Sequence, residues 1–270
     1  SLIVRRLLDK GHEVRVLGRS TRPSDEEVEF HAIDLAHENI PPKVCEGVDA
    51  IFHVAAKAGV WGSSESYEAA NVLAVRQVLK SCRRHGVGFL VHTSTPSVVF
   101  TGQAFRGEGE ELPYGRNWLC HYARIKAVAE QEVLSANGQN FLKTIALRPH
   151  LVWGPGDPHL VPKAISQARS GKLKIVGNGD NRVDLTHVEN VAHAHLLALD
   201  ALQGGVHPGG KAYFVSQGEP TALWPWLNDL LARLGEPPVT AKVSLRTAYA
   251  AGFLLECAWR ILGLRGEPPM

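Results

Sequence analysis

Tyr122 and Lys126 are the residues whose types and spacing could do chemistry. They stand four residues apart in WLCHYARIKAVAEQEVL (118–134), a segment that predicts a helix. Residues at this spacing share one helix face, with Cβ atoms about 5–6 Å apart. A Tyr and a Lys can also fall at this spacing by chance, so the pair alone is weak evidence. Its meaning depends on the surrounding sequence.

The chemistry that such a pair could perform is proton transfer to and from an alcohol oxygen. Hydride reduction of a ketone leaves an alkoxide that must receive a proton. A free tyrosine, with a pKa of about 10, donates a proton well but is a poor base near neutral pH. A nearby lysine ammonium favours the phenolate, and the hydroxyl of Thr95 could provide a second hydrogen bond to the developing charge. Tyr122 and Lys126 are therefore candidates for a catalytic dyad, and an ordinary tyrosine with a lysine one helical turn away is the alternative.

The elements that must position this dyad alternate along the chain. This order predicts βαβ units, in which a parallel sheet is covered on both faces. The fold class is α/β: a Rossmann-type doubly wound parallel sheet, with a smaller, interleaved C-terminal substrate lobe. The sheet domain is expected over 1–170 and most of the lobe over 171–270. Expected helices cover 1–9, 64–86, 118–134 and 160–171, and expected strands cover 13–17, 28–34, 49–56, 88–95 and 143–154.

A dinucleotide fold begins with a strand and a glycine-rich turn, which brings the pyrophosphate to the start of the first helix. This sequence begins inside what reads as that helix, so we expect the first strand and glycine loop to be absent. GVHPGGKA (205–212) resembles a phosphate loop but has Ala212 where Ser or Thr belongs and leads into a strand. GPGD (154–157) lacks a third glycine. Both segments are interpreted as turns.

Ligands of such sheets lie at the carboxyl ends of the strands. Arg19 follows the second strand of the expected fold, where NAD-preferring folds carry an acidic residue, and this favours NADP. Ala55 and Ala56 are small enough to let a cofactor approach the backbone. Lys57 could reach a phosphate or ribose, and surface exposure is an equal alternative. Thr93 ends the strand before Thr95 and completes this cofactor set.

Aromatic residues flank the expected site. Trp61, Tyr114 and Trp118 stand in the loops GVWG and YGRNWL and suggest an apolar substrate pocket. Ordinary packing is the alternative for all three.

Composition excludes several classes of protein. The formal charge of +2 is small and both signs are interspersed, which is unlike a nucleic-acid binder. The four scattered cysteines suit a reducing, cytoplasmic compartment and form no zinc pattern. No run of about 18 apolar residues predicts a membrane span. Residues 245–264 predict an amphipathic helix, which either packs in the lobe or touches a membrane face. His187, His193 and His195 lack the spacing of a metal site, so no metal is expected.

The motifs HVAAKAGVWG, HTSTPSVVF, YARIKAVAE, LRPHLVWGPGD and VGNGDNRVDLTHVENVAHAHLLA together resemble the extended short-chain dehydrogenase/reductases. The branch resembled most is the 3β-hydroxysteroid dehydrogenase group, which includes sterol-4-carboxylate 3-dehydrogenases and bacterial 2-alkyl-3-oxoalkanoate reductases. Members of the family begin with the glycine loop and continue past the EPP segment. The resemblance therefore implies that this chain is truncated at both ends.

The resemblance also assigns roles. It implies that Tyr122 is the general acid/base, with Lys126 as its partner and Thr95 holding the substrate oxygen, although the family usually has Ser there. It places Asn71 as a helix residue supporting the site and Pro149 beside the nicotinamide. Two further positions, Asp34 and Leu35, match an adenine-contacting Asp-Leu, and a helix N-cap is the alternative for Asp34. A homodimer is also implied.

The expected function is therefore NADP-dependent, or alternatively NAD-dependent, interconversion of a ketone and a secondary alcohol. The substrate is expected to be bulky and apolar, such as a sterol or a long-chain 3-oxo or 3-hydroxy acid. The alternatives are a sugar-nucleotide epimerase or dehydratase of the same fold, and a non-catalytic dinucleotide-binding module. A sensor would need none of the three candidate catalytic side chains, and truncation would weaken cofactor binding even in an enzyme.

Overall fold

The computed structural model describes residues 1–19, 28–59, 61–116, 118, 120–157, 160–205 and 208–262. Contacts divide the chain into two compact units. The sheet unit comprises 1–150 and 189–215, and the lobe unit comprises 151–188 and 216–270. The sequence-based expectation placed the sheet domain over 1–170 and most of an interleaved lobe over 171–270. In the structure the chain passes from the sheet unit into the lobe, back again, and then into the lobe once more, so the two units are interleaved.

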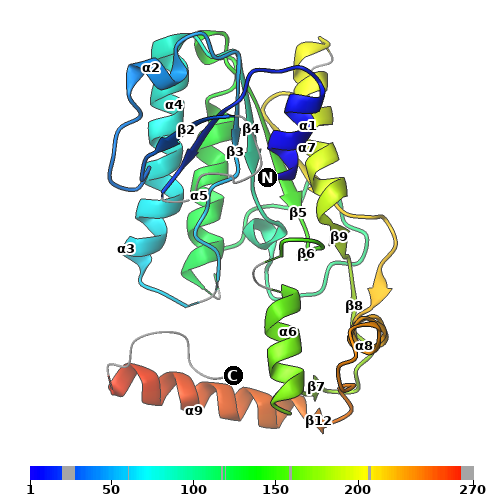
Figure 1. Ribbon diagram of the computed structural model, residues 1–270. Coiled ribbons are helices and arrows are strands. Elements are labelled where there is room, and N and C mark those ends of the chain that lie inside the picture. Colours follow the sequence, from blue (N-terminus) through cyan, green and yellow to red (C-terminus); the bar gives the residue numbers. More distant parts are fainter. Residues whose placement is uncertain are drawn as a thin grey trace. The chain divides into compact units, whose positions relative to one another are not determined.

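The sheet unit is built on a four-stranded parallel sheet with the strand order β10-β5-β4-β3 (Figure 1). These strands are β3 (Ala50–His53), β4 (Phe89–Thr93), β5 (Lys143–Pro149) and β10 (Lys211–Val215). A further parallel pair joins β1 (Arg15–Gly18) and β2 (Glu29–Ala32). The predicted α/β class with a parallel sheet is confirmed.

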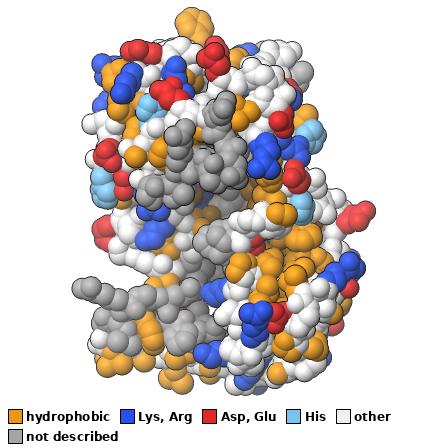
Figure 2. All heavy atoms as spheres, in the orientation of Figure 1, with side chains coloured by type: hydrophobic (Ala, Val, Ile, Leu, Met, Phe, Trp, Pro, Cys, Tyr) orange, Lys and Arg blue, Asp and Glu red, His pale blue; other side chains and the backbone are white. Residues whose placement is uncertain are grey.

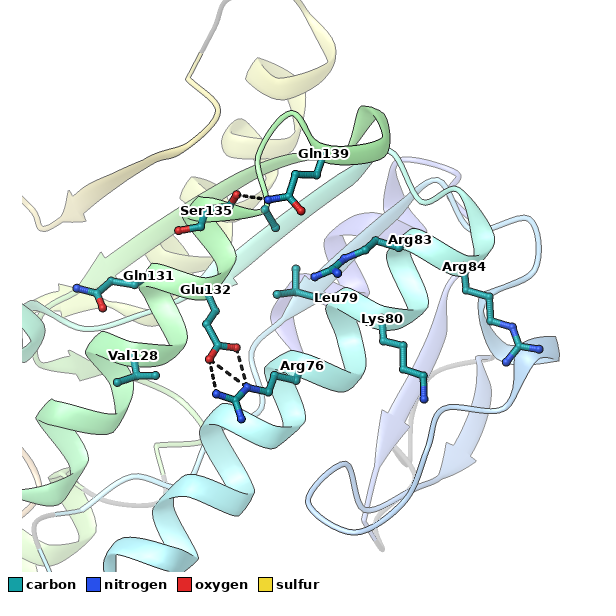
Figure 3. Close-up of a pocket in the computed structure, with 11 residues that line it drawn as sticks. Arg76, Leu79, Lys80, Arg83, Arg84, Val128, Gln131, Glu132, Ser135 and Gln139 are labelled. Carbon is teal, nitrogen blue, oxygen red and sulfur yellow. Dashed lines mark hydrogen bonds and ion pairs between the residues drawn. The ribbon is translucent and has the colours of Figure 1, made fainter.

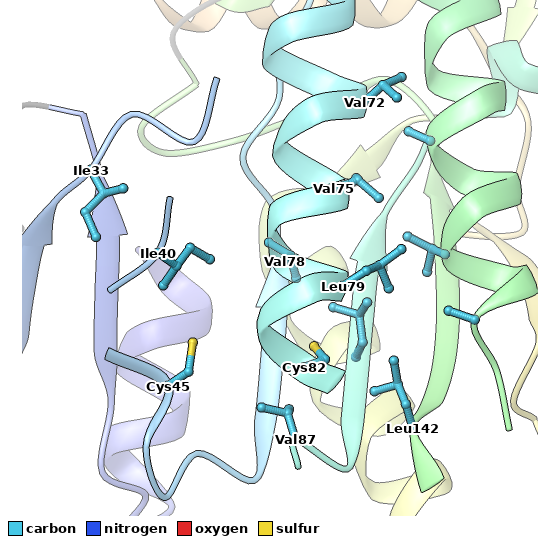
Figure 4. Packing of buried hydrophobic residues seen from close by; sticks show 14 of the residues in the cluster. Ile33, Ile40, Cys45, Val72, Val75, Val78, Leu79, Cys82, Val87 and Leu142 are labelled. Atoms are coloured by element: carbon cyan, nitrogen blue, oxygen red, sulfur yellow. The ribbon is translucent and has the colours of Figure 1, made fainter. Parts of the chain in front are cut away.

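Helices cover both faces of this sheet. Because alternate side chains of a strand point to opposite faces, Leu90 packs with α4 and α5 while Val91 packs with α7. Figure 4 shows the first of these cores, where Val75, Val78 and Leu79 of α4 gather. The helices of the sheet unit are α1 (Leu2–Asp9), α2 (Pro42–Cys45), α3 (Ser64–Tyr67), α4 (Ala74–His85), α5 (His121–Ser135) and α7 (Val188–Gln203).

Two predicted elements are interrupted. The helix expected over 64–86 contains a π-helical segment, Glu68–Leu73, between α3 and α4, and it ends at Gly86 with a φ of 68°. The strand expected over 143–154 stops at Pro149. Leu151 then adopts a φ of 37°, and β6 (Val152–Trp153) pairs with β9 (Thr186–His187) in the lobe unit. Residues 206–207 of the GVHPGGKA segment lie outside the described residues.

The lobe unit has its own small core of Ile175, Leu227, Leu231 and Val239. Its helix α9 carries exposed apolar side chains, among them Tyr249 and Phe253 at 74% and 68% exposure, and Figure 2 shows hydrophobic side chains along the lower edge. Within the described residues, no helix is long and apolar enough to cross a membrane. The remaining elements are α6 (Leu160–Arg169), β7 (Ile175–Val176), β8 (Arg182–Val183), β11 (Thr221–Ala222), α8 (Leu223–Arg233), β12 (Lys242–Val243) and α9 (Leu245–Ile261).

Candidate active site

Helix α5 presents Tyr122, Lys126 and Glu130 at intervals of four residues, so the three side chains share one face of the helix. Lys126 and Glu130 are 2% and 0% exposed, and Tyr122 is half-buried at the start of the helix. A buried lysine needs partners, since an unpaired buried charge is costly. The partners of Lys126 come from β4.

The Lys126 ammonium lies at the carboxyl end of β4. Its Nζ donates to the Thr93 carbonyl oxygen at 2.7 Å and lies 3.4 Å from His92 Nε2. Burial lowers the pKa of Lys126 to about 8, an effect that the nearby Glu130 carboxylate partly offsets. The ammonium is therefore anchored to the strand that ends at Thr93, two residues before Thr95.

Tyr122 is brought together with Thr95. Burial raises the pKa of Tyr122, and a hydrogen bond with the Thr95 side chain acts in the opposite direction. The sequence argument expected the Lys126 ammonium to favour the phenolate. That effect stays a prediction: burial, Thr95, Cys120 and Tyr67 are the main influences on the pKa of Tyr122, and the Lys126 ammonium donates to the Thr93 carbonyl. Tyr122 is thus held as a protonated phenol at neutral pH.

Asn71 fixes the segment that follows β3. It is 2% exposed and lies in the π-helical segment, where its Oδ1 accepts from Lys57 N at 2.8 Å and its Nδ2 donates to Lys57 O at 3.1 Å. In the segment after β3, the small side chains of Ala55 and Ala56 are exposed, and Val54 is 47% exposed. An exposed strip of small and apolar residues at a strand end is what a flat cofactor ring needs for close approach.

The Lys57 side chain is directed away from this strip. Its Nζ donates to Ser66 Oγ at 2.7 Å and lies 4.9 Å from the centre of the Tyr67 ring. Tyr67 in turn donates to the carbonyl oxygens of Gly59 and Trp61, each at 2.9 Å. Lys57 therefore braces the loop that contains Trp61.

The remaining cofactor candidates lie at strand ends. Arg19 is exposed directly after β1. Asp34 follows β2 and accepts from Ala36 N at 3.0 Å, which makes it the cap of a turn, while Leu35 packs against the core. Pro149 ends β5 and is half-buried. The Arg19 guanidinium is exposed and the Lys126 ammonium is buried, and both are hydrogen-bond donors of the kind that phosphates and ribose hydroxyls need. The small side chains of Ala55 and Ala56 leave room beside the backbone, so the set fits a nicotinamide dinucleotide.

Two of the predicted substrate residues take part in packing. Tyr114 and Trp118 lie against Val98, Val99 and Ala127. The Tyr114 hydroxyl donates to Glu130 Oε1 at 2.7 Å, and burial together with Glu130 raises the pKa of Tyr114. This hydroxyl is therefore engaged in the interior.

Sequence reasoning missed the buried partners around α5. Arg148 of β5 binds Glu130 through two hydrogen bonds, Nε to Oε2 at 3.0 Å and Nη2 to Oε1 at 2.6 Å. The position of Glu130 four residues after Lys126 was a usable signal, because it extends the same helix face. His92 and His53 were also missed, although both stand in the motifs quoted above.

The histidines considered for a metal are engaged or scattered. His195 is buried, with Nε2 2.7 Å from Thr93 Oγ1 and Nδ1 2.7 Å from Val191 O. Among the described residues, no three His, Cys, Asp or Glu side chains gather in a way that could hold a metal ion. His195 thus supports the end of β4.

Comparison with known proteins gives consistent matches. Residues 1–245 match the model of the 3-beta hydroxysteroid dehydrogenase/isomerase family. The sequence is 46% identical over 99% of the chain to a 2-alkyl-3-oxoalkanoate reductase of Stenotrophomonas maltophilia, covering 82% of that protein. It is 45% identical over 88% of the chain to a reductase of the same name from Shewanella oneidensis, of which it spans 63%.

More distant matches include proteins whose names refer to other substrates. The mouse sterol-4-alpha-carboxylate 3-dehydrogenase, decarboxylating, is 36% identical over 94% of the chain and is covered to 70%. Among solved structures, MoeE5 in complex with UDP-glucuronic acid and NAD has a TM-score of 0.73 and 28% identity. The match covers 90% of this chain and 81% of that one.

Proposed function

The chain belongs to the 3-beta hydroxysteroid dehydrogenase/isomerase family, a family of oxidoreductases acting on CH–OH groups, and from this we propose that it reduces the 3-oxo group of 2-alkyl-3-oxoalkanoates with NADPH. The carrying observation is the pairing of Tyr122 with Thr95 beside the anchored Lys126. The two 2-alkyl-3-oxoalkanoate reductases share 46% and 45% identity with the chain, against 36% for the sterol enzyme.

The proposed mechanism uses the side chains at the end of β4 and the start of α5. Tyr122 donates its phenolic proton to the substrate oxygen while Thr95 donates a second hydrogen bond to it. A nicotinamide bound at the carboxyl ends of the strands would supply the hydride for the carbonyl carbon. The raised pKa of Tyr122 keeps the phenol protonated, the form that can donate this proton. Lys126 places a positive charge beneath the site, and solvent returns a proton to Tyr122.

Turnover of a synthetic 2-alkyl-3-oxo acid, followed by NADPH absorbance, tests this function. We expect Tyr122→Phe to lower kcat by about 10²–10⁴-fold, since it removes the general acid. Tyr249→Phe is the matched control, because Tyr249 is 74% exposed on α9. Equal activity of Tyr122→Phe and wild type would refute the mechanism.

Sugar nucleotides remain the alternative substrates. They are supported by MoeE5, whose structure contains UDP-glucuronic acid and NAD. Chromatographic analysis of the products formed from UDP-glucose with NAD distinguishes the two, because an epimerase or dehydratase regenerates its nicotinamide and leaves the absorbance unchanged. Turnover of UDP-glucose without turnover of the 3-oxo acid would replace the proposal with the alternative.

The preference for NADPH is proposed from Arg19, which is exposed after β1. A charge-assisted hydrogen bond to the 2′-phosphate is worth about 1.5–3 kcal/mol. Arg19→Ala should therefore raise the KM for NADPH by about 10–100-fold while leaving that for NADH unchanged. Arg233→Ala, which changes an exposed arginine at the end of α8, is the control. An equal change for both cofactors would contradict the assignment.

We also propose a homodimer through the outer face of α4 and α5. Support comes from a groove of about 780 Å³ on this face, which contains no candidate catalytic side chain (Figure 3). Arg76 and Glu132 bridge the two helices beside it. Sedimentation of wild type and Arg83→Glu tests this: loss of the dimer in the variant is expected, and a monomeric wild type would refute it.

The four free cysteines support a reducing, cytoplasmic location.

A further inference from the structure

His53 and His92 form a buried pair behind the candidate active site. They occupy matching positions on the neighbouring parallel strands β3 and β4. Their rings are stacked, with centroids 5.1 Å apart and an angle of 12° between the planes, and the two Nδ1 atoms are 3.0 Å apart. The residues are 4% and 1% exposed. Burying two polar imidazole rings in an apolar core is costly unless they are hydrogen-bonded, so the hydrogen-bond partners of the pair must be identified.

The pair faces the Lys126 ammonium. His92 Nε2 lies 3.4 Å from Lys126 Nζ, and the same Nζ donates to the Thr93 carbonyl at 2.7 Å. The other titratable groups around this cluster are Glu130 of α5, which acts on Lys126, and His195 of α7, which acts on His92. The ammonium is thus held by two consecutive residues of β4.

Both imidazoles are neutral at physiological pH. Burial, followed by the Lys126 charge, lowers the pKa of His53 to about 3 and places that of His92 well below its usual range. Two neutral rings that approach through their Nδ1 atoms share one hydrogen. An ammonium only donates, so His92 Nε2 must offer its lone pair and the shared hydrogen belongs to His92 Nδ1. His53 is then the Nε2–H form.

The geometry points to His92, fixed by His53, as a positioning residue that accepts a hydrogen bond from the Lys126 ammonium and holds it at the carboxyl end of β4. Two of the three ammonium hydrogens are then taken by β4, which fixes the direction of the third. The kinetic consequence of this inference rests on the proposed reductase function. The order of the hydrogen bonds between Lys126, His92 and His53 does not depend on that function.

Nitrogen-15 spectra of the histidine rings test the order directly, without turnover. Long-range couplings distinguish Nδ1–H from Nε2–H rings, and His53→Gln and His92→Gln assign the signals. We expect His92 as the Nδ1–H form and His53 as the Nε2–H form at pH 7. His92 carrying Nε2–H, or a charged imidazolium, would overturn the inference whatever the enzyme catalyses.

The pH profile of kcat/KM tests the consequence. His92→Phe fills the volume but removes the acceptor, so the Lys126 ammonium is less stable and should lose its proton at lower pH. We expect the alkaline limb to move down by about one pH unit, with about a tenfold lower rate near that limb. His92→Gln, which keeps an acceptor, should restore the wild-type limb.

Thr144→Val is the matched control. Thr144 lies in the neighbouring strand β5, and within the described residues its buried hydroxyl has no hydrogen-bond partner. A wild-type profile in folded His92→Phe would overturn the positioning role. If His92→Phe fails to fold, the ring spectra of wild type decide alone. An inactive wild type with the expected ring forms would reject the reductase function and keep the hydrogen-bond order.

Discussion

At the scale of single residues, Glu130 and Arg148 form an ion pair that is buried away from solvent. Their side chains are 0% and 3% exposed. The Arg148 guanidinium also lies over the rings of Tyr114 and Phe214, 5.8 Å and 5.4 Å from their centres. One pair therefore ties α5, β5, β10 and the loop containing Tyr114 to one another.

Arg148→Met should destabilise the protein by about 3–5 kcal/mol, because the buried Glu130 would lose its ion-pair partner and keep only the Tyr114 hydroxyl and the nearby Lys126 charge. The double variant Arg148→Met/Glu130→Leu should recover most of the loss. Urea unfolding measures both. Arg233→Ala is the matched control, since its pair with Asp229 is exposed and should cost no more than about 1 kcal/mol. Equal losses in the two single variants would contradict the account.

Thr95 has two roles that substitution can separate. Its Oγ1 accepts from Ser97 N at 3.3 Å at the start of a 3₁₀ turn, and its hydroxyl acts on Tyr122. Thr95→Val should lower kcat by about 10²–10³-fold and reduce stability by about 1 kcal/mol through the lost cap. Thr95→Ser should retain most of both. If Thr95→Val changed stability alone, the hydroxyl would be structural.

At the scale of elements, the π-helical segment places Asn71 against the backbone of Lys57. Asn71→Ala should raise the KM for the cofactor about tenfold and change kcat less, because the segment after β3 loses both of its hydrogen bonds. Asn228→Ala is a close control: Asn228 makes the same two bonds to Val239 in the lobe unit, at 2.8 and 3.1 Å. Its stability loss should be similar with an unchanged KM. Equal KM effects would reject a local role for Asn71.

Apolar periodicity in the sequence predicted the helices and parallel strands, since burial of one face leaves a regular pattern. It could not predict the π-helical segment, because one extra residue in a turn leaves the apolar positions readable as a single helix. The break at Leu151 was also missed, as LRPHLVWG is apolar on both sides of it. Tyr122 and Lys126 were predicted from spacing. His53 and His92 meet only across two strands, so their contact depends on strand order and register.

At the scale of the whole molecule, buried neutral histidines set the response to acid. The pKa of His53 is lowered to about 3, and those of His92 and His195 are also lowered, chiefly by burial. Between the folded and unfolded values the unfolded chain binds more protons, so stability rises with pH. It is therefore lost as pH falls from about 6.5 toward 3.

Each such histidine should remove about 1.4 kcal/mol per pH unit below its unfolded pKa. Urea unfolding between pH 7 and pH 5 measures the slope, which should be shallower in His53→Phe. His12→Gln, at an exposed position, should keep the wild-type slope. An unchanged slope in His53→Phe would show that this histidine is protonated in the folded protein.

The interleaving of the two units has a consequence for biosynthesis. The sheet unit leaves off at His150 and is completed only by 189–215. A further 66 residues must follow the end of β5 at Pro149 before its edge neighbour β10 is complete at Val215. At about 5–20 residues per second on the ribosome, roughly 3–13 s pass before β10 emerges. For that interval the backbone edge of β5 and the face later covered by α7 have no native partner. The nascent chain must be kept from aggregating through this edge until translation supplies its last strand.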